Sequence, residues 1–142
     1  MTIKSGQIKF IVETRLSHAN LSIEVYDSSP IDVIETYDDV VENSYACESG
    51  ELTLLNWSKE LIHRLNPLPA SQSIYRVRYH LRHSGNLSED GITAGEKATG
   101  SLIQIWPGPP IAPAELKISS SSGRFWHPRT KLAEAYRANA AD

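Results

Sequence analysis

Hydrophobic and polar side chains alternate most regularly in residues 74–82. Four large apolar residues recur there at a period of two: Tyr75, Val77, Tyr79 and Leu81. Such alternation is typical of a β-strand with one face in a core and one face in water. The sequence therefore predicts a strand at the centre of the fold. Its predicted solvent face carries the intervening polar residues Arg76, Arg78, His80 and Arg82.

Similar but shorter patterns, separated by turn residues, predict further strands. The predicted strands are residues 7–13, 20–27, 51–57, 101–106 and 114–118. A turn is expected at Gly50, and the prolines of residues 107–110 should end the fourth of these strands. Residues 31–45 are ambiguous, but their β-branched pairs and the Asp38-Asp39 step favour two strands separated by a turn.

Residues 83–100 contain four glycines and few large aliphatic residues. This composition predicts a long exposed loop that joins two paired strands. Many short strands without alternating helices indicate an all-β fold, and we expect an antiparallel β-sandwich.

The pattern changes near the C-terminus. Residues 129–137 are rich in helix formers, with Leu132 and Tyr136 four apart, which predicts a short C-terminal helix. We therefore divide the chain into a β-sandwich domain, residues 1–123, and a tail with the short helix, residues 124–142.

The composition is that of an ordinary globular protein. The 142 residues are 40% hydrophobic and 22% charged, enough for one domain with its own core. The single Cys47 excludes an internal disulfide and a cysteine-based zinc site. The N-terminus lacks the apolar core of a signal peptide, and no apolar run is long enough to span a bilayer. We expect a cytoplasmic protein that does not bind membranes.

Charge is distributed unevenly along the chain. Residues 21–58 hold nine acidic residues and no Lys or Arg, a local charge of −9 that leaves +6 elsewhere because the total is −3. The negative total argues against nucleic-acid binding, which usually requires a basic excess. Two interpretations of the acidic stretch stay open. The acids border turns and pair with arginines of neighbouring strands, or they form a surface that docks a basic protein.

The second interpretation leads to a specific set of partner-binding residues. Electrostatic complementarity would give such a surface a fast and selective association. Trp126 joins the set because it lies in a segment of low strand character, where an aromatic side chain is expected to be exposed. The candidate residues are Asp32, Glu35, Asp38, Asp39, Glu42 and Trp126.

No pattern predicts catalysis, a cofactor or a metal site. His80 and His83 are three apart, so a continuous strand would point them to opposite faces. No Ser or Cys has the glycine-framed turn that activates a nucleophile, and the glycine-rich loop lacks the ending of a phosphate-binding loop. We expect a non-enzymatic protein without a cofactor. The alternative to protein binding is a small-ligand or carbohydrate-binding β-sandwich that uses exposed tryptophans.

Several short motifs occur in a familiar order. They are residues 41–44 (VENS), 50–54 (GELTL), Trp57, 65–69 (LNPLP), 75–78 (YRVR) and 102–107 (LIQIWP). This order resembles a group of small, mostly uncharacterised bacterial β-sandwich proteins that is similar to the competence protein J family, inhibitors of the DNA-entry nuclease. The resemblance covers residues 20–118. It implies an all-β fold and inhibition of a nuclease or toxin by direct binding, but it assigns no role to any residue.

Overall fold

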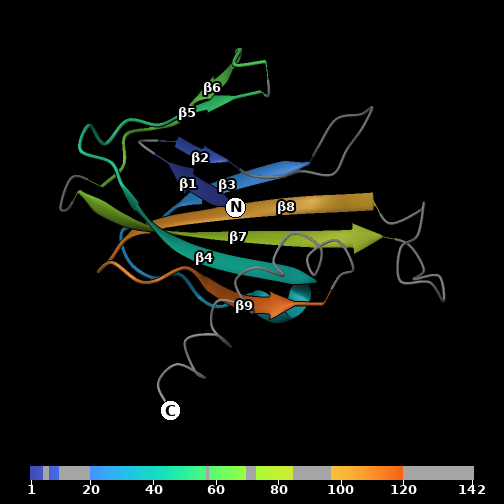
Figure 1. Cartoon of the computed structure of the whole chain (residues 1–142). Coiled ribbons are helices and arrows are strands. Elements are labelled where there is room, and N and C mark those ends of the chain that lie inside the picture. Colours follow the sequence, from blue (N-terminus) through green and yellow to red (C-terminus); the bar gives the residue numbers. More distant parts are fainter. Residues whose placement is uncertain (5–6, 10–19, 57, 70–72, 85–96, 120–142) are drawn as a thin grey trace, which may run out of the picture.

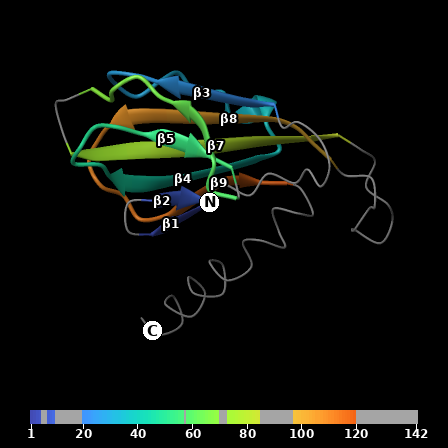
Figure 2. The same ribbon diagram turned by 90° about the horizontal axis from the view of Figure 1, so that it is seen from above.

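A five-stranded β-sheet is the largest element of the protein (Figures 1 and 2). The computed structural model describes residues 1–4, 7–9, 20–56, 58–69, 73–84 and 97–119. The order of the strands across the sheet is β3-β8-β7-β4-β9. In chain order these strands are β3 (Leu21–Val25), β4 (Asp39–Ala46), β7 (Ile74–Ser84), β8 (Lys97–Pro107) and β9 (Ala114–Ile118).

Two short ribbons accompany the sheet. β1 (Thr2–Lys4) pairs with β2 (Gln7–Lys9), and β5 (Thr53–Leu55) pairs with β6 (Leu61–Arg64). The one helical element in the described part of the chain is a 3-10 turn, η1 (Ile34–Thr36). The chain turns before β5 at Gly50, whose φ of 69° lies in the left-handed region that favours glycine.

The sheet is mixed rather than antiparallel throughout. β7 runs antiparallel to both of its neighbours, β4 and β8, and β9 runs antiparallel to β4. The edge strand β3, however, runs parallel to β8. The predicted all-β character is confirmed for the described residues, but the prediction of a purely antiparallel arrangement is wrong at this edge. Parallel strands need a long connection, and here β4 and β7 intervene in the sequence between β3 and β8.

One face of the sheet forms the hydrophobic core, as the alternation along β7 predicts. The apolar face is built from β4, β7, β8 and the chain after β4, and its ten buried members are Val41, Tyr45, Cys47, Leu68, Tyr75, Val77, Tyr79, Leu81, Ile103 and Ile105. Met1, Ile8 and Leu52 pack against them. The N-terminal ribbon and the segment that leads into β5 therefore cover this face.

The other face of β7 is also covered, so the prediction that it lies in water is wrong. His80 is fully buried, and the side chains of Arg76 and Arg78 are only 23% and 11% exposed. The chain between β3 and β4 crosses this face. There, the Tyr37 ring packs against His80 with 4.9 Å between the centroids. Arg82 alone of the four polar residues is exposed.

Residues 31–45 contain one strand, not the two that the β-branched pairs predict. Their first half forms a loop with the η1 turn, where Asp32 Oδ1 accepts the backbone N–H of Ile34 at 2.7 Å. The second half belongs to β4, whose first four residues are all buried. A strand buried on both faces shows no alternation, which explains the ambiguous pattern.

The remaining strand predictions hold where the structure describes them. β2, β3, β5 and β9 fall within or on predicted segments, whereas β8 extends beyond its predicted segment at both ends and shortens the predicted loop. β1 and β6 have no predicted counterpart. Residues 10–19, 85–96 and the predicted tail and helix of residues 124–142 lie outside the described part.

Candidate functional site

The acidic residues of the basic-free stretch divide into an inner and an outer group. Asp39 and Glu42, on β4, are buried. Asp27, Asp32 and Glu35, on the connection between β3 and β4, are exposed. The interpretation that the acids have partners within the protein therefore concerns the buried acids, and the interpretation that they dock a basic protein concerns the exposed ones.

Glu42 is the centre of a buried ion cluster on the polar face of the sheet. Its carboxylate is 2% exposed and lies between two arginines of β7. Arg76 donates to Oε1 from Nε at 2.7 Å and from its Nη2 group, and Arg78 Nε donates to Oε2 at 2.7 Å. Trp106 covers both guanidinium groups at 5.7 and 5.0 Å from the ring centroid. Glu42 thus serves as the internal counterion of the arginines and does not face solvent.

Asp39 also has a structural position. Its Oδ1 accepts the backbone N–H of Ser119 at 3.0 Å, which ties the end of β9 to β4. Asp38 is half-buried, and its carbonyl oxygen accepts the same N–H group at 3.1 Å. Of the six candidate residues, Asp39 and Glu42 are therefore buried, Asp38 is partly accessible, and Asp32 and Glu35 are exposed. Trp126 lies outside the described residues.

The outer group defines the acidic loop, residues 26–38. Among the described residues, no Lys or Arg forms an ion pair with Asp27, Asp32 or Glu35. Two cations do approach the loop, but they bind its carbonyl oxygens. Arg82 donates from Nε and Nη2 to the Thr36 carbonyl at 3.1 and 3.0 Å, and Lys117 Nζ donates to the Glu35 carbonyl at 3.4 Å.

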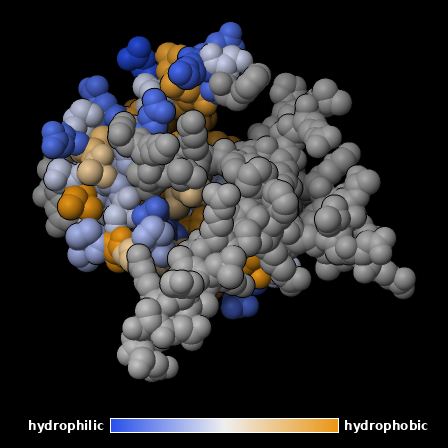
Figure 3. Space-filling view, in the orientation of Figure 1, coloured by the Kyte–Doolittle hydropathy of each residue, from blue (hydrophilic) through white to orange (hydrophobic). Residues whose placement is uncertain are grey.

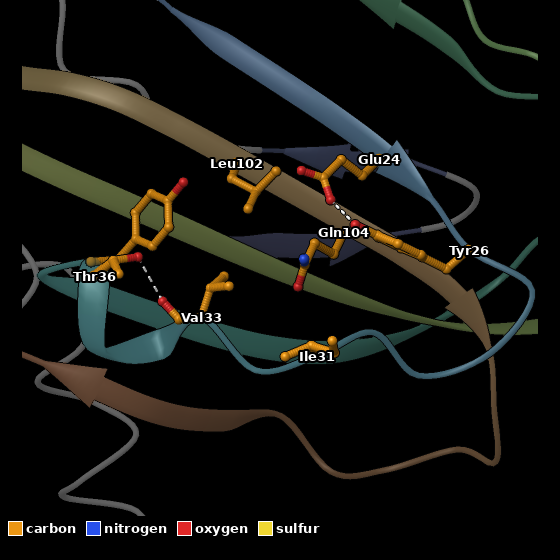
Figure 4. A pocket seen from close by; sticks show the side chains of 8 residues that line it. Glu24, Tyr26, Ile31, Val33, Thr36, Leu102 and Gln104 are labelled. Carbon is orange, nitrogen blue, oxygen red and sulfur yellow. Dashed lines mark hydrogen bonds between the residues drawn. The ribbon is translucent and has the colours of Figure 1, made fainter.

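A pocket of about 390 Å³ lies between the acidic loop and the sheet (Figure 4). The loop contributes one side of it, and the paired strands β3 and β8 contribute the other. Glu24 and Gln104 face each other in the parallel register, which places both side chains on the polar face. The lining residues are Glu24, Tyr26, Ile31, Val33, Thr36, Tyr37, Leu102 and Gln104.

Hydrogen bonding in and beside the pocket is incomplete. The Tyr26 hydroxyl donates to the Glu24 carboxylate. This bond, with burial and the charge of Glu24, raises the pKa of Tyr26, whereas a hydrogen bond with Gln104 acts in the opposite direction. Gln104 is 2% exposed, yet its Oε1 has no hydrogen-bond partner among the described residues. Figure 4 shows this side chain directed toward the space between β8 and the loop.

His80 lies in the same layer, behind Tyr37. Burial lowers its pKa, the nearby charge of Arg78 acts in the same direction, and the hydrogen bond with the Leu102 carbonyl opposes both. The ring is therefore neutral near pH 7, with its Nδ1–H donating to that carbonyl at 3.1 Å. Its Nε2 is buried without a partner in the described part of the chain.

The ribbon of β5 and β6 carries an exposed apolar surface on the opposite side of the sheet. Leu55, Leu61 and Ile62 are all exposed there. The hydrophobic surface at the top of Figure 3 coincides with the place of this ribbon in Figure 1. Lys59, Glu60 and Arg64 are exposed on the same ribbon and its turn, and their mixed charge favours no partner of either sign.

Carbohydrate binding would require exposed tryptophans, and the one tryptophan that the structure describes is not exposed. Trp106 is buried over the ion cluster. Trp57 and Trp126 lie outside the described residues. The pocket, by contrast, had no signal in the sequence, because Glu24 and Gln104 lie 80 positions apart and meet only through the parallel pairing.

No protein-family model matches the sequence, and no curated protein or solved structure matches it. The resemblance to the competence protein J family thus stays a prediction. In the part of the chain that the structure describes, no helix combines the length and the hydropathy needed to cross a membrane.

Proposed function

We propose that the protein is a non-enzymatic binding module that docks a basic protein through its acidic loop. The observation that carries this proposal is the position of Asp27, Asp32 and Glu35, which are exposed and free of ion pairs among the described residues. The buried Glu42 pairs with Arg76 and Arg78 instead, and Arg82 and Lys117 donate to carbonyl oxygens of the loop rather than to these carboxylates. The three exposed carboxylates can therefore face a basic surface, and the complementary charge would raise the association rate and the selectivity.

The same loop offers an apolar contact. Ile31 is 88% exposed and directly precedes Asp32. Protein interfaces commonly combine an apolar centre with a polar or charged rim. A basic partner that places apolar surface against Ile31 fits this arrangement.

The proposed partner is a nuclease or toxin that the protein inhibits or to which it confers immunity. Support comes from the resemblance to nuclease inhibitors and from the charge of the loop. A nuclease presents basic side chains to the phosphates of its substrate, and an acidic loop seated on those side chains would block access. We also propose a cytoplasmic place of action, in keeping with the unpaired Cys47, and a sandwich in which the ribbons form the second layer.

A charge-matched capture experiment tests the proposal. The immobilised triple variant Asp27→Asn/Asp32→Asn/Glu35→Gln is compared with wild type and with a control that removes three exposed acids elsewhere. This control is Glu48→Gln/Glu51→Gln/Glu60→Gln. Wild type and control should retain the same basic protein from an extract of the source organism at about 0.05 M salt and release it at about 0.5 M. The loop variant should retain far less.

Two results would contradict the proposal. Equal retention by the loop variant would show that the loop is not the docking surface, and binding that ignores salt would exclude the electrostatic mechanism. The inhibitor part is then tested by assaying the captured protein for nuclease or toxic activity with and without the binding module. Activity that the module leaves unchanged would restrict the proposal to binding alone.

A second candidate function, small-ligand binding, is favoured by the pocket. Its volume of about 390 Å³ falls in the range of ligand pockets, about 300–1,000 Å³. Tyr26 and Tyr37 supply aromatic side chains at its edge. A neutral sugar or metabolite that shifts the amide signals of Leu102 and Gln104 in a ligand screen by nuclear magnetic resonance (NMR) would support this function. A screen without such shifts would count against it.

A further inference from the structure

The pocket beneath the acidic loop is rich in hydrogen-bond acceptors. None of its eight lining residues is Lys, Arg or His. Gln104 lines it, and the buried Oε1 of this side chain has no hydrogen-bond partner among the described residues. Because a buried acceptor without a donor is unfavourable, a ligand that brings an N–H group gains from filling this position.

A carboxylate stands beside that acceptor. Glu24 is only half-buried, and among the described residues it receives one hydrogen bond, from Tyr26. A carboxylate has about four lone-pair sites, so Glu24 can accept further donors. Glu24 is the one charged residue among the eight that line the pocket, so the charge of the lining favours a cation.

The cations already near the pocket are engaged elsewhere. Arg78 is held by Glu42. Arg82 lies over the Tyr37 ring at 4.9 Å and donates to the Thr36 carbonyl. Neither lines the pocket, so neither arginine occupies the space beside Glu24 and Gln104.

The pocket walls suit an alkyl chain that ends in a charged group. Ile31, Val33 and Leu102 provide aliphatic surface, and Figure 4 shows them around the space into which Gln104 points. Long basic side chains commonly pack their methylene groups on such surface while the charged end finds polar partners. We propose that the pocket receives a single alkyl guanidinium or ammonium group, namely an arginine or lysine side chain of the protein partner. This inference rests on the proposed function and identifies the group that the partner inserts.

Two small probes with the same alkyl stem, one a cation and one neutral, test the pocket directly. Butylguanidinium and the uncharged butylurea have the same stem and nearly the same shape. In NMR titrations of the full chain, butylguanidinium should produce saturable shifts at the amides of Glu24, Leu102 and Gln104, and butylurea should bind at least about tenfold more weakly. Equal binding of the two probes, or no saturable shift with butylguanidinium, would overturn the proposal.

Substitutions in the pocket and a matched control identify the groups responsible. Gln104→Met and Glu24→Gln should each weaken butylguanidinium binding about tenfold, because each removes a charged or buried acceptor contact. Glu51→Gln removes the same charge from an exposed position outside the pocket and should leave binding unchanged. Gln104 is buried, so Gln104→Met can unfold the protein. Glu24 is only half-buried, and Glu24→Gln should fold and still test the pocket in that case. Unchanged binding by Glu24→Gln would refute the role of the carboxylate.

The capture experiment separates this inference from the proposed function. Glu24→Gln keeps all three exposed loop acids and should still retain less of the basic partner than wild type. Full retention by Glu24→Gln and Gln104→Met would reject the pocket and leave the proposed function standing. Butylguanidinium binding without any captured basic protein would reject the proposed function. An arginine peptide that binds no better than butylguanidinium would reject the protein origin of the group, because the loop acids should strengthen peptide binding.

Discussion

Replacing Glu42 by glutamine removes one negative charge from the buried ion cluster and changes almost no volume. In the wild-type protein, both carboxylate oxygens accept hydrogen bonds, Oε1 from Arg76 and Oε2 from Arg78. The glutamine amide keeps one acceptor oxygen but turns an N–H₂ group toward an arginine donor. The two guanidinium groups then lie on the polar face without a counterion.

The size of the effect follows from the burial of the three charges. Breaking a buried ion pair by removing one partner typically costs about 3–5 kcal/mol. Glu42 is 2% exposed, but the side chains of Arg76 and Arg78 are 23% and 11% exposed and can recover part of their hydration. We therefore expect the lower end, about 3 kcal/mol of lost unfolding free energy, which corresponds to roughly 10 °C in melting temperature.

Chemical denaturation of Glu42→Gln against wild type measures this loss, with the exposed Glu48→Gln as the control. The control should change the free energy of unfolding by less than about 0.5 kcal/mol. The triple variant Glu42→Leu/Arg76→Met/Arg78→Met should recover most of the stability, because it removes all three charges together. A loss below about 1 kcal/mol for Glu42→Gln would refute the buried cluster and would return Glu42 to the candidate docking surface.

Three further predictions concern the core and the polar face. Burial lowers the pKa of His80 from 6.5, so the unfolded state binds a proton at this side chain before the folded state does as the pH falls. The free energy of unfolding should therefore drop below pH 6.5, by at most about 1.4 kcal/mol per pH unit. Denaturant titrations of His80→Phe should show a smaller drop. Gly108→Ala places a Cβ 2.7 Å from Arg76 Cγ and should cost about 1–3 kcal/mol by thermal melting, while Gly100→Ala, with no atom within 4 Å of its Cβ, should not destabilise the protein. The buried Cys47 should react with a thiol reagent only as fast as the protein unfolds, and rapid reaction of the native protein would contradict its burial.

The period-two pattern of β7 was sufficient to predict which of its side chains share a face. It could not show what covers each face. The alternation alone placed the arginines in water. The alternative that they pair with acids of neighbouring strands is correct for Arg76 and Arg78, whose counterion Glu42 comes from β4, more than 30 positions earlier in the chain. Alternation reports the geometry of one strand, whereas burial depends on the partners that the topology brings to it.

The parts of the fold that could not be predicted have equally physical reasons. β6 escaped prediction because all four of its residues are exposed, so no alternation marks it. The parallel pairing of β3 with β8 is a long-range contact without a local signal. The pocket depends on that pairing and was therefore missed. The basic-free stretch nominated the exposed Asp32 and Glu35 but equally the buried Asp39 and Glu42, because composition does not report burial.

The association rate of the captured partner, measured as a function of ionic strength, tests most directly the claim that the acidic loop is the docking surface. For wild type and for the Glu48→Gln/Glu51→Gln/Glu60→Gln control, the rate constant should fall steeply as salt is added. For Asp27→Asn/Asp32→Asn/Glu35→Gln, it should be slow at low salt and nearly independent of salt. Wild-type association that does not respond to salt, or a loop variant that associates like wild type, would contradict the claim.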